Sequence, residues 1–189
     1  NVLCKLDIKD HLLTVRKVDI AVTSPGSLFE DKKQNVWMAK GEEGVYQLTP
    51  DNQLTLHLSK DNGYVKSICE DQRGNIYVGS IRKGLFIYDK ERKTFVPIDL
   101  KEKGELPVCF LYSGIPNELY IGTDGKGVVI YNIRTHEISE YKFDNNYFDS
   151  GNSKIHSILK DNSGNLWLAV YQKGVILIPA RTNSFKYIG

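Results

Sequence analysis

Short apolar runs alternate with clusters of Gly, Asn, Asp and Lys along the chain. Residues 64–98 contain four such runs, each rich in Val, Ile, Tyr and Phe and each bounded by turn residues. This pattern predicts strands at 64–70, 75–80, 85–89 and 94–98. No stretch combines helical periodicity with capping residues, so the pattern predicts an all-β chain.

The same pattern returns four times, and an aromatic residue marks each copy. The markers are spaced by 40, 43 and 47 residues, and a small residue follows each of them two positions later. A glycine stands seven positions after each marker, and an aspartate stands six positions before three of them. The markers are Trp37, Tyr77, Tyr120 and Trp167, the glycines are Gly44, Gly84, Gly127 and Gly174, and the aspartates are Asp31, Asp71 and Asp161. In the fourth copy, strands are expected at 154–159, 165–170, 175–178 and 184–188.

A period of 40 to 50 residues is typical of solenoids, propellers and arrays, and the strands favour a β-propeller. The third strands read LFIY, VVIY and VILI, which are apolar on both faces and therefore require cover on both sides. Blades of a propeller, each a four-stranded antiparallel sheet between two neighbours, supply that cover. We interpret the small residue after each marker as room for close approach between blades. The expected units are the second half of a blade at 1–22, then blades at 23–60, 61–100, 101–146 and 147–189.

These units amount to about four and a half blades, whereas closed propellers have roughly four to eight. We therefore expect the chain to be a segment of a larger propeller.

Composition narrows the function classes. The chain has 25 basic and 23 acidic residues, a balance that does not indicate binding to nucleic acid or to an anionic membrane. No apolar run approaches the roughly 18–20 residues that span a bilayer. Cys4, Cys69 and Cys109 have no paired spacing, so we expect buried free thiols and neither disulfides nor a zinc site.

The motif Asp-x-x-Gly-Asn-[Ile/Leu]-[Trp/Tyr]-[Val/Leu]-[Gly/Ala], with Gly seven positions after the aromatic residue, resembles the two-component regulator propeller repeat. Residues 70–90 and 160–180 match it best, whereas the first copy has Gln34 at the turn glycine and the third copy lacks the aspartate. The resemblance implies a seven-bladed periplasmic sensor propeller of a hybrid two-component system, held by an inner-membrane protein. It also implies a downstream kinase module, transcription regulation, an oligosaccharide ligand and a homodimer of the parent protein.

The loops between the second and third strands vary between copies, and varied loops on a rigid scaffold are where recognition usually occurs. We expect their polar side chains to bind sugar hydroxyls or carboxylates, with a tyrosine ring as a stacking surface. These candidate ligand-binding residues are Arg82, Lys83, Asp124, Lys126, Tyr171, Gln172 and Lys173.

Two other functions stay open, because fold alone does not select a function. One is a propeller lyase or hydrolase, for which Glu70, Lys154 and His156 are the main candidates in the first strands. The other is a protein–protein interaction scaffold. The sequence shows no catalytic triad pattern and no repeated histidine, and DNSGN lacks the further carboxylates of a calcium loop. We therefore expect a non-catalytic segment without cofactor or metal.

Overall fold

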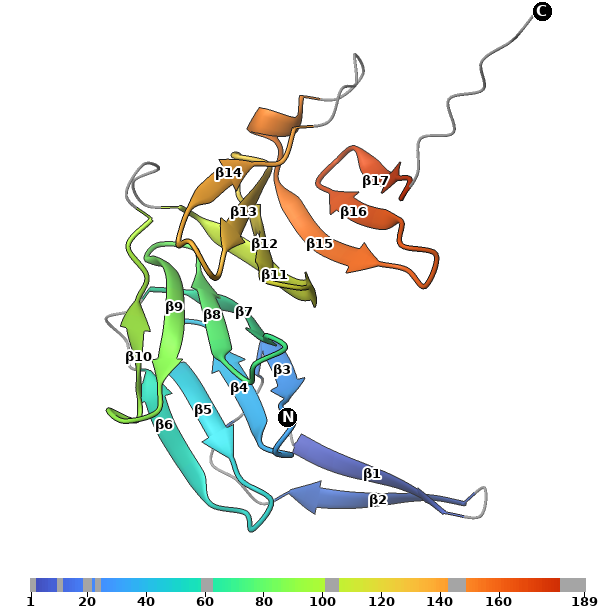
Figure 1. The fold of residues 1–189 in the computed structure, drawn as a ribbon. Coiled ribbons are helices and arrows are strands. Elements are labelled where there is room, and N and C mark those ends of the chain that lie inside the picture. Colours follow the sequence, from blue (N-terminus) through green and yellow to red (C-terminus); the bar gives the residue numbers. More distant parts are fainter. Residues whose placement is uncertain are drawn as a thin grey trace, which may run out of the picture.

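The computed structural model describes residues 3–9, 12–18, 22, 25–58, 63–100, 106–142 and 149–180. These residues form antiparallel sheets joined one after another, in agreement with the predicted all-β class (Figure 1). The only helix among them is the 3-10 turn η2 at Ser150–Asn152. The expected strand at 184–188 lies outside the described residues. The strands are β1 Leu3–Lys9, β2 Leu12–Val18, β3 Ser27–Glu30, β4 Val36–Lys40, β5 Gly44–Leu48, β6 Leu54–Leu58, β7 Val65–Glu70, β8 Ile76–Ser80, β9 Gly84–Asp89, β10 Thr94–Pro97, β11 Val108–Ile115, β12 Glu118–Thr123, β13 Val128–Asn132, β14 Ile138–Glu140, β15 Ile155–Lys160, β16 Leu166–Val170 and β17 Gly174–Ile178.

Each sheet is a meander in which strands adjacent in sequence pair with each other. The described residues give a hairpin, β1–β2, three four-stranded sheets, β3–β6, β7–β10 and β11–β14, and a three-stranded sheet, β15–β17. The four strands predicted for residues 64–98 are confirmed to within one residue at each end. The sheets agree with propeller blades, whereas the blade boundaries taken from the sequence stay a prediction.

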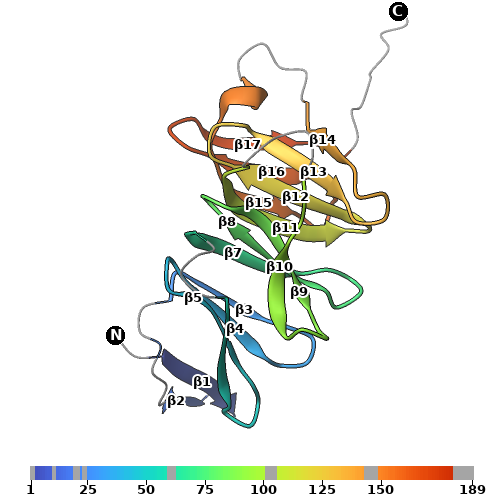
Figure 2. The same ribbon diagram turned by 90° about the vertical axis from the view of Figure 1, so that its left-hand side faces the viewer.

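The four sheets from β3 to β17 stack face to face in chain order, with their first strands next to one another (Figures 1 and 2). Gly79 and Gly122 lie where one sheet meets the next. A Cβ atom at Gly79 would lie 2.2 Å from Val108 Cγ1, and one at Gly122 would lie 2.9 Å from Ile155 Cγ2. Both partners belong to the first strand of the following sheet. The interpretation of the small residue as room for blade contact is therefore correct at these two positions.

The aspartate of the motif holds its turn and its aromatic residue together. Asp71 Oδ1 accepts from the backbone N–H groups of Arg73 and Asn75, and its Oδ2 accepts from Asn75 Nδ2 at 2.8 Å and from the Tyr77 hydroxyl at 3.3 Å. Asp31 and Asp161 make the equivalent bonds in their own copies, with the indole Nε1 atoms of Trp37 and Trp167 each at 2.8 Å. In these three copies both carboxylate oxygens accept from donors in the turn or in the marker side chain.

The marker rings differ in burial. Trp37, Tyr77 and Tyr120 are buried between sheets, but 38% of the surface of Trp167 is exposed. Next to it, Leu159, Val175 and Leu177 of the β15–β17 sheet are also exposed. The sequence predicted cover on both faces of every third strand, and the described residues do not provide it for β17. The hairpin β1–β2 likewise exposes Leu6, Ile8, Leu12, Leu13 and Val15.

The turn between first and second strands needs a left-handed residue in every copy. Gly74 and Gly164 have φ values of 78° and 87°, and Gln34 adopts 64° in the first copy. In the third copy Asn117 has φ 61° and turns β11 into β12 without the aspartate. In this copy Tyr120 lies beside the carboxylate of Glu118. Burial, and to a smaller extent this carboxylate, raise the pKa of the Tyr120 hydroxyl.

The cysteines are free thiols in the described part of the chain, as expected, but they differ in exposure. Cys69 and Cys109 are buried, whereas Cys4 is exposed because it lies on the hairpin β1–β2, so the expectation was wrong for Cys4. Within the described ranges, no helix is long and apolar enough to cross a bilayer.

Candidate functional site

The loops that join second to third strands gather at one end of the stacked sheets, because every sheet is an antiparallel meander of the same direction. Their shape is set by backbone geometry. The glycine seven positions after each marker has positive φ in all four copies, at 127°, 77°, 63° and 82° for Gly44, Gly84, Gly127 and Gly174. L-residues with side chains rarely adopt such values, which explains the repeated glycine. We call this end of the sheets the loop end.

A repeated backbone bond fastens these loops to the first strands. The first residue of a loop donates its N–H to the carbonyl of the residue just before the first strand: Ile81 to Tyr64 at 2.9 Å, Asp124 to Pro107 at 2.9 Å and Tyr171 to Lys154 at 3.0 Å. The loop end thus places Tyr64 and Lys154 beside the candidate loops, although sequence analysis left them out of the expected binding set.

The first strands carry a β-bulge at the same position in three successive sheets. The pairing register shifts between Val65 and Ser67, between Val108 and Phe110, and between Ile155 and Ser157. The additional residues are Lys66, Cys109 and His156. A bulge leaves its residue out of the ladder and turns its side chain away from the regular alternation. Lys66 and His156 are exposed, and Cys109 is buried.

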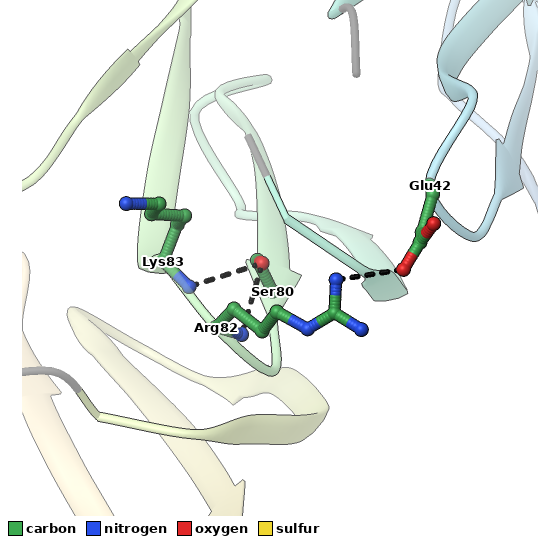
Figure 3. Close-up of polar contacts among 4 residues, drawn as sticks. All are labelled: Glu42, Ser80, Arg82 and Lys83. Atoms are coloured by element: carbon green, nitrogen blue, oxygen red, sulfur yellow. Dashed lines mark hydrogen bonds and ion pairs between the residues drawn. The ribbon is translucent and has the colours of Figure 1, made fainter. Parts of the chain in front are cut away.

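Arg82 and Lys83 are placed by Ser80, the last residue of β8. The hydroxyl of Ser80 accepts from the backbone N–H groups of Arg82 at 3.3 Å and Lys83 at 3.2 Å. Figure 3 shows the two side chains leaving the loop on opposite sides, and Arg82 Nη1 reaches Glu42 Oε1 of the preceding sheet at 2.6 Å. Both side chains of this ion pair are mostly exposed, so we expect it to stabilise the fold by less than about 1 kcal/mol.

Asp124 and Tyr171 meet through Lys154, which lies between their loops. Lys154 Nζ is 2.6 Å from Asp124 Oδ2 and 5.9 Å from the centroid of the Tyr171 ring. The hydrogen bond to Asp124 raises the pKa of Lys154. The His156 ring packs edge-on against Tyr171, with 5.5 Å between centroids. These four residues of two neighbouring sheets form one polar and aromatic group, the Lys154 group.

The remaining candidates lie on the same loops but make local contacts. Gln172 has φ 56° and donates from Nε2 to the Tyr171 hydroxyl at 3.3 Å. Lys173 Nζ donates to Ser153 Oγ at 3.4 Å, and the backbone N–H of Lys126 donates to Thr123 Oγ1 at 2.9 Å. The structure therefore brings Asp124 and Tyr171 together and leaves Arg82 and Lys83 in a separate pair of loops.

A signal for the missed residues is present in the sequence. Lys66, Cys109 and His156 each stand eleven positions before the marker of their copy, and Tyr64, Pro107 and Lys154 each stand thirteen before it. Their chemical types differ, so a search for identical letters passes over them. An alignment of the copies by position groups them.

The three enzyme candidates do not all converge in the described residues. Lys154 and His156 both lie against Tyr171 at the loop end, whereas Glu70 lies at the other end of β7. At about 3.3 Å per residue, the four positions from Lys66 to Glu70 span roughly 13 Å. Within the described ranges no three His, Cys, Asp or Glu side chains are placed to share a metal ion.

Two segments of the chain, residues 59–82 and 149–172, match the family model described as the two-component regulator propeller. Each includes a first strand, the turn after it and the second strand with its loop. No curated protein matches the chain.

Three solved structures illustrate the likeness of fold. The extracellular domain of a putative hybrid two-component system from B. thetaiotaomicron is 21% identical, with 80% of this chain and 23% of that chain covered and a TM-score of 0.62. Virginiamycin B lyase from Staphylococcus aureus is 14% identical, with 95% and 64% covered and a TM-score of 0.69. An auxiliary nutrient binding protein from Bacteroides thetaiotaomicron is 15% identical, with 81% and 37% covered and a TM-score of 0.62. The chain spans about a quarter of the length of the extracellular domains it resembles.

Proposed function

The chain carries the two-component regulator propeller repeat, and from that premise we propose that it is the ligand-sensing part of a hybrid two-component signalling protein. In this proposal it lies in the periplasm, held by a protein of the inner membrane. It binds an oligosaccharide at the loop end and regulates transcription through kinase and response-regulator parts elsewhere in the parent protein, which acts as a homodimer. The segment itself is non-catalytic.

The observation that carries the proposal is the pair of repeat matches at residues 59–82 and 149–172. The solved extracellular domains with the same fold support it, since they come from putative two-component systems. The geometry of the loop end is consistent with it, because the backbone fixes the loops and leaves their side chains variable. Tyr171 is 52% exposed and offers a ring face, and Asp124 and Lys154 offer an acceptor and a donor beside it.

The gene tests the signalling part of the proposal. Past the codon for residue 189 we expect the reading frame to encode further propeller blades, an apolar span of about 20 residues and a helical kinase module. A stop codon soon after residue 189 would contradict a sensor of this organisation.

Calorimetry tests the binding part. Titration of the chain with a panel of neutral and acidic oligosaccharides is expected to show binding that Tyr171→Ala weakens by about five- to tenfold, the loss of one stacked ring. Tyr171→Phe keeps the ring and is expected to retain most of the affinity. Equal affinities of the Tyr171→Ala variant and the unchanged chain would show that Tyr171 does not contribute to binding.

A further inference from the structure

The bulged first strands bring basic and polar side chains of three sheets to the loop end. Lys66, Cys109 and His156 occupy the same bulge position, and Lys154 stands two residues before His156. Electrostatics connects them across the sheets. Burial raises the pKa of the Cys109 thiol, as does the charge of Asp124, while the charges of Lys154 and Lys66 lower it. β11, which carries the buried Cys109, contacts both β7 and β15, so Lys66 and Lys154 lie on either side of its strand.

Each of the two lysines lies against an exposed tyrosine ring. Lys66 Nζ is 5.7 Å from the centroid of Tyr64, and Lys154 Nζ is 5.9 Å from that of Tyr171. Tyr64 is 39% exposed and Tyr171 is 52% exposed. The pairs are built from different positions, since the tyrosine precedes the strand in one and belongs to a loop in the other. Each pair presents an ammonium group beside an accessible ring.

The charge of the loop end is positive. Loops 40–43, 81–83, 124–127 and 171–173, with strand starts 64–66, 107–109 and 154–156, contain seven Lys or Arg and three Asp or Glu residues. Glu42 pairs with Arg82 and Asp124 with Lys154. Lys66 has no carboxylate within ion-pair distance among the described residues, and the Tyr64 ring is its charge-stabilising contact. Lys40 likewise pairs with Glu43, and the charge of Lys173 acts on the carboxylate of Asp149. The remaining basic excess includes Lys66, for which an acidic group of a ligand would be the charge partner.

From these observations we infer that the loop end binds an acidic oligosaccharide, a chain of sugar rings that carries carboxylate or sulfate groups. Lys66 and Lys154 bind the acidic groups, and Tyr64 and Tyr171 lie against the faces of the sugar rings. The inference rests on the proposed saccharide-binding function and adds the charge of the ligand and the residues that select it. Charge-assisted hydrogen bonds of this kind are shorter and stronger than neutral ones.

Calorimetric titration with two ligands tests the inference. One is an α-linked tetramer of galacturonic acid, and the other is its methyl ester, a neutral ligand with the same sugar rings. We expect the acid to bind at least tenfold more tightly than the ester and to lose that advantage between 0.05 and 0.5 M salt, because exposed charges are screened. Lys66→Gln and Lys154→Gln are each expected to weaken binding of the acid about tenfold. The matched control is Lys160→Gln, which removes the same charge from β15 at the opposite end and is expected to leave the affinity unchanged. Far-UV circular dichroism checks that every variant is folded.

A tetrasaccharide of sulfated chondroitin distinguishes the two acidic groups. If it binds and its desulfated form, which keeps the glucuronate carboxylates, does not, the recognised group is sulfate, and the inference stands with the same lysine dependence. If the ester binds as tightly as the acid, acid selectivity is overturned while saccharide binding stands. If none of these ligands binds, or if Lys160→Gln weakens binding as much as Lys66→Gln, the inference is overturned. The gene test of the signalling organisation is unaffected by that result.

Discussion

The contact between Gly79 and Val108 predicts that one added methyl group separates two blades. A Cβ atom at position 79 would lie 2.2 Å from Val108 Cγ1 and 3.0 Å from its Cβ, far inside van der Waals contact. Val108 is fully buried and β-branched, so its side chain has little freedom to rotate away. Gly79 does not have positive φ, and the change Gly79→Ala therefore tests packing without backbone strain.

Two effects of opposite sign set the magnitude. Overpacking of a close-packed core destabilises by about 1–3 kcal/mol. Alanine in place of glycine in a strand gains about 0.5–1 kcal/mol, because glycine loses more conformational freedom on folding. We expect Gly79→Ala to lower the free energy of unfolding by about 1–2 kcal/mol. Gly122→Ala, with its nearest contact at 2.9 Å from Ile155, is expected to lower it less.

Urea unfolding followed by far-UV circular dichroism measures these differences. Gly26→Ala is the matched control, because a Cβ atom there meets only the carbonyl oxygen of Ala39 at 3.8 Å. Val108→Ala removes the obstructing methyl groups, so the double variant Gly79→Ala/Val108→Ala is expected to be more stable than the sum of the single effects by about 1 kcal/mol or more.

The reasoning is refuted if Gly79→Ala is as stable as Gly26→Ala. It is also refuted if the double variant shows no coupling, because the loss would then come from something other than contact between the sheets.

Three further predictions concern single residues. Burial raises the pKa of Asp31, but hydrogen bonds from Asn35, Trp37 and Lys33 together lower it by more, so it lies below the ordinary 3.8. The stability that these bonds give is therefore present above about pH 4 and is lost as the pH falls through the lowered pKa. Asp31→Asn is expected to reduce that acid loss in urea unfolding at pH 2–6, and an unchanged slope would exclude Asp31 as its source. Gln34→Gly is expected to stabilise by about 0.5–1 kcal/mol, since position 34 is left-handed, and destabilisation would show that the Gln34 side chain matters more than its φ. Burial raises the pKa of the Cys69 thiol to about 12, so a disulfide reagent at pH 8 is expected to modify Cys4 rapidly and Cys69 only on unfolding; equal rates would show that Cys69 is accessible.

Much of the fold follows from the sequence, because its elements have local causes. The glycine seven positions after each marker is required by positive φ, and the small residue after the marker is required by the neighbouring strand at Gly79 and Gly122. Each such constraint fixes the residue type at one position, so the same type of residue recurs at that position in the copies. The strands at 64–98 were predictable for the same reason.

The candidate site was less predictable, because it depends on strand register and on contacts between sheets, which the identity of a single residue does not reveal. The loops were identified, but Lys66 and His156 reach the loop end through bulges that depend on strand register. Lys154 joins Asp124 to Tyr171 although it belongs to neither loop. The exposure of Trp167 also depends on which elements cover it, because Trp37 at the same repeat position is buried.

The two ends of the sheets are built in different ways, and this difference explains where the copies vary. At the turn after the first strand, side chains stabilise the fold: Asp71 binds its own turn, Asn75 and Tyr77, and a change of any one leaves partners unsatisfied. At the loop end the backbone does this work, through left-handed glycines such as Gly84 and through N–H bonds to the residue before each first strand. The contacts of the loop side chains, such as Arg82 with Glu42 and Asp124 with Lys154, differ from copy to copy, as do the side chains themselves. Under the proposed function, such a propeller acquires a new ligand when residues at the loop end change, while the turns at the other end keep the sheets together.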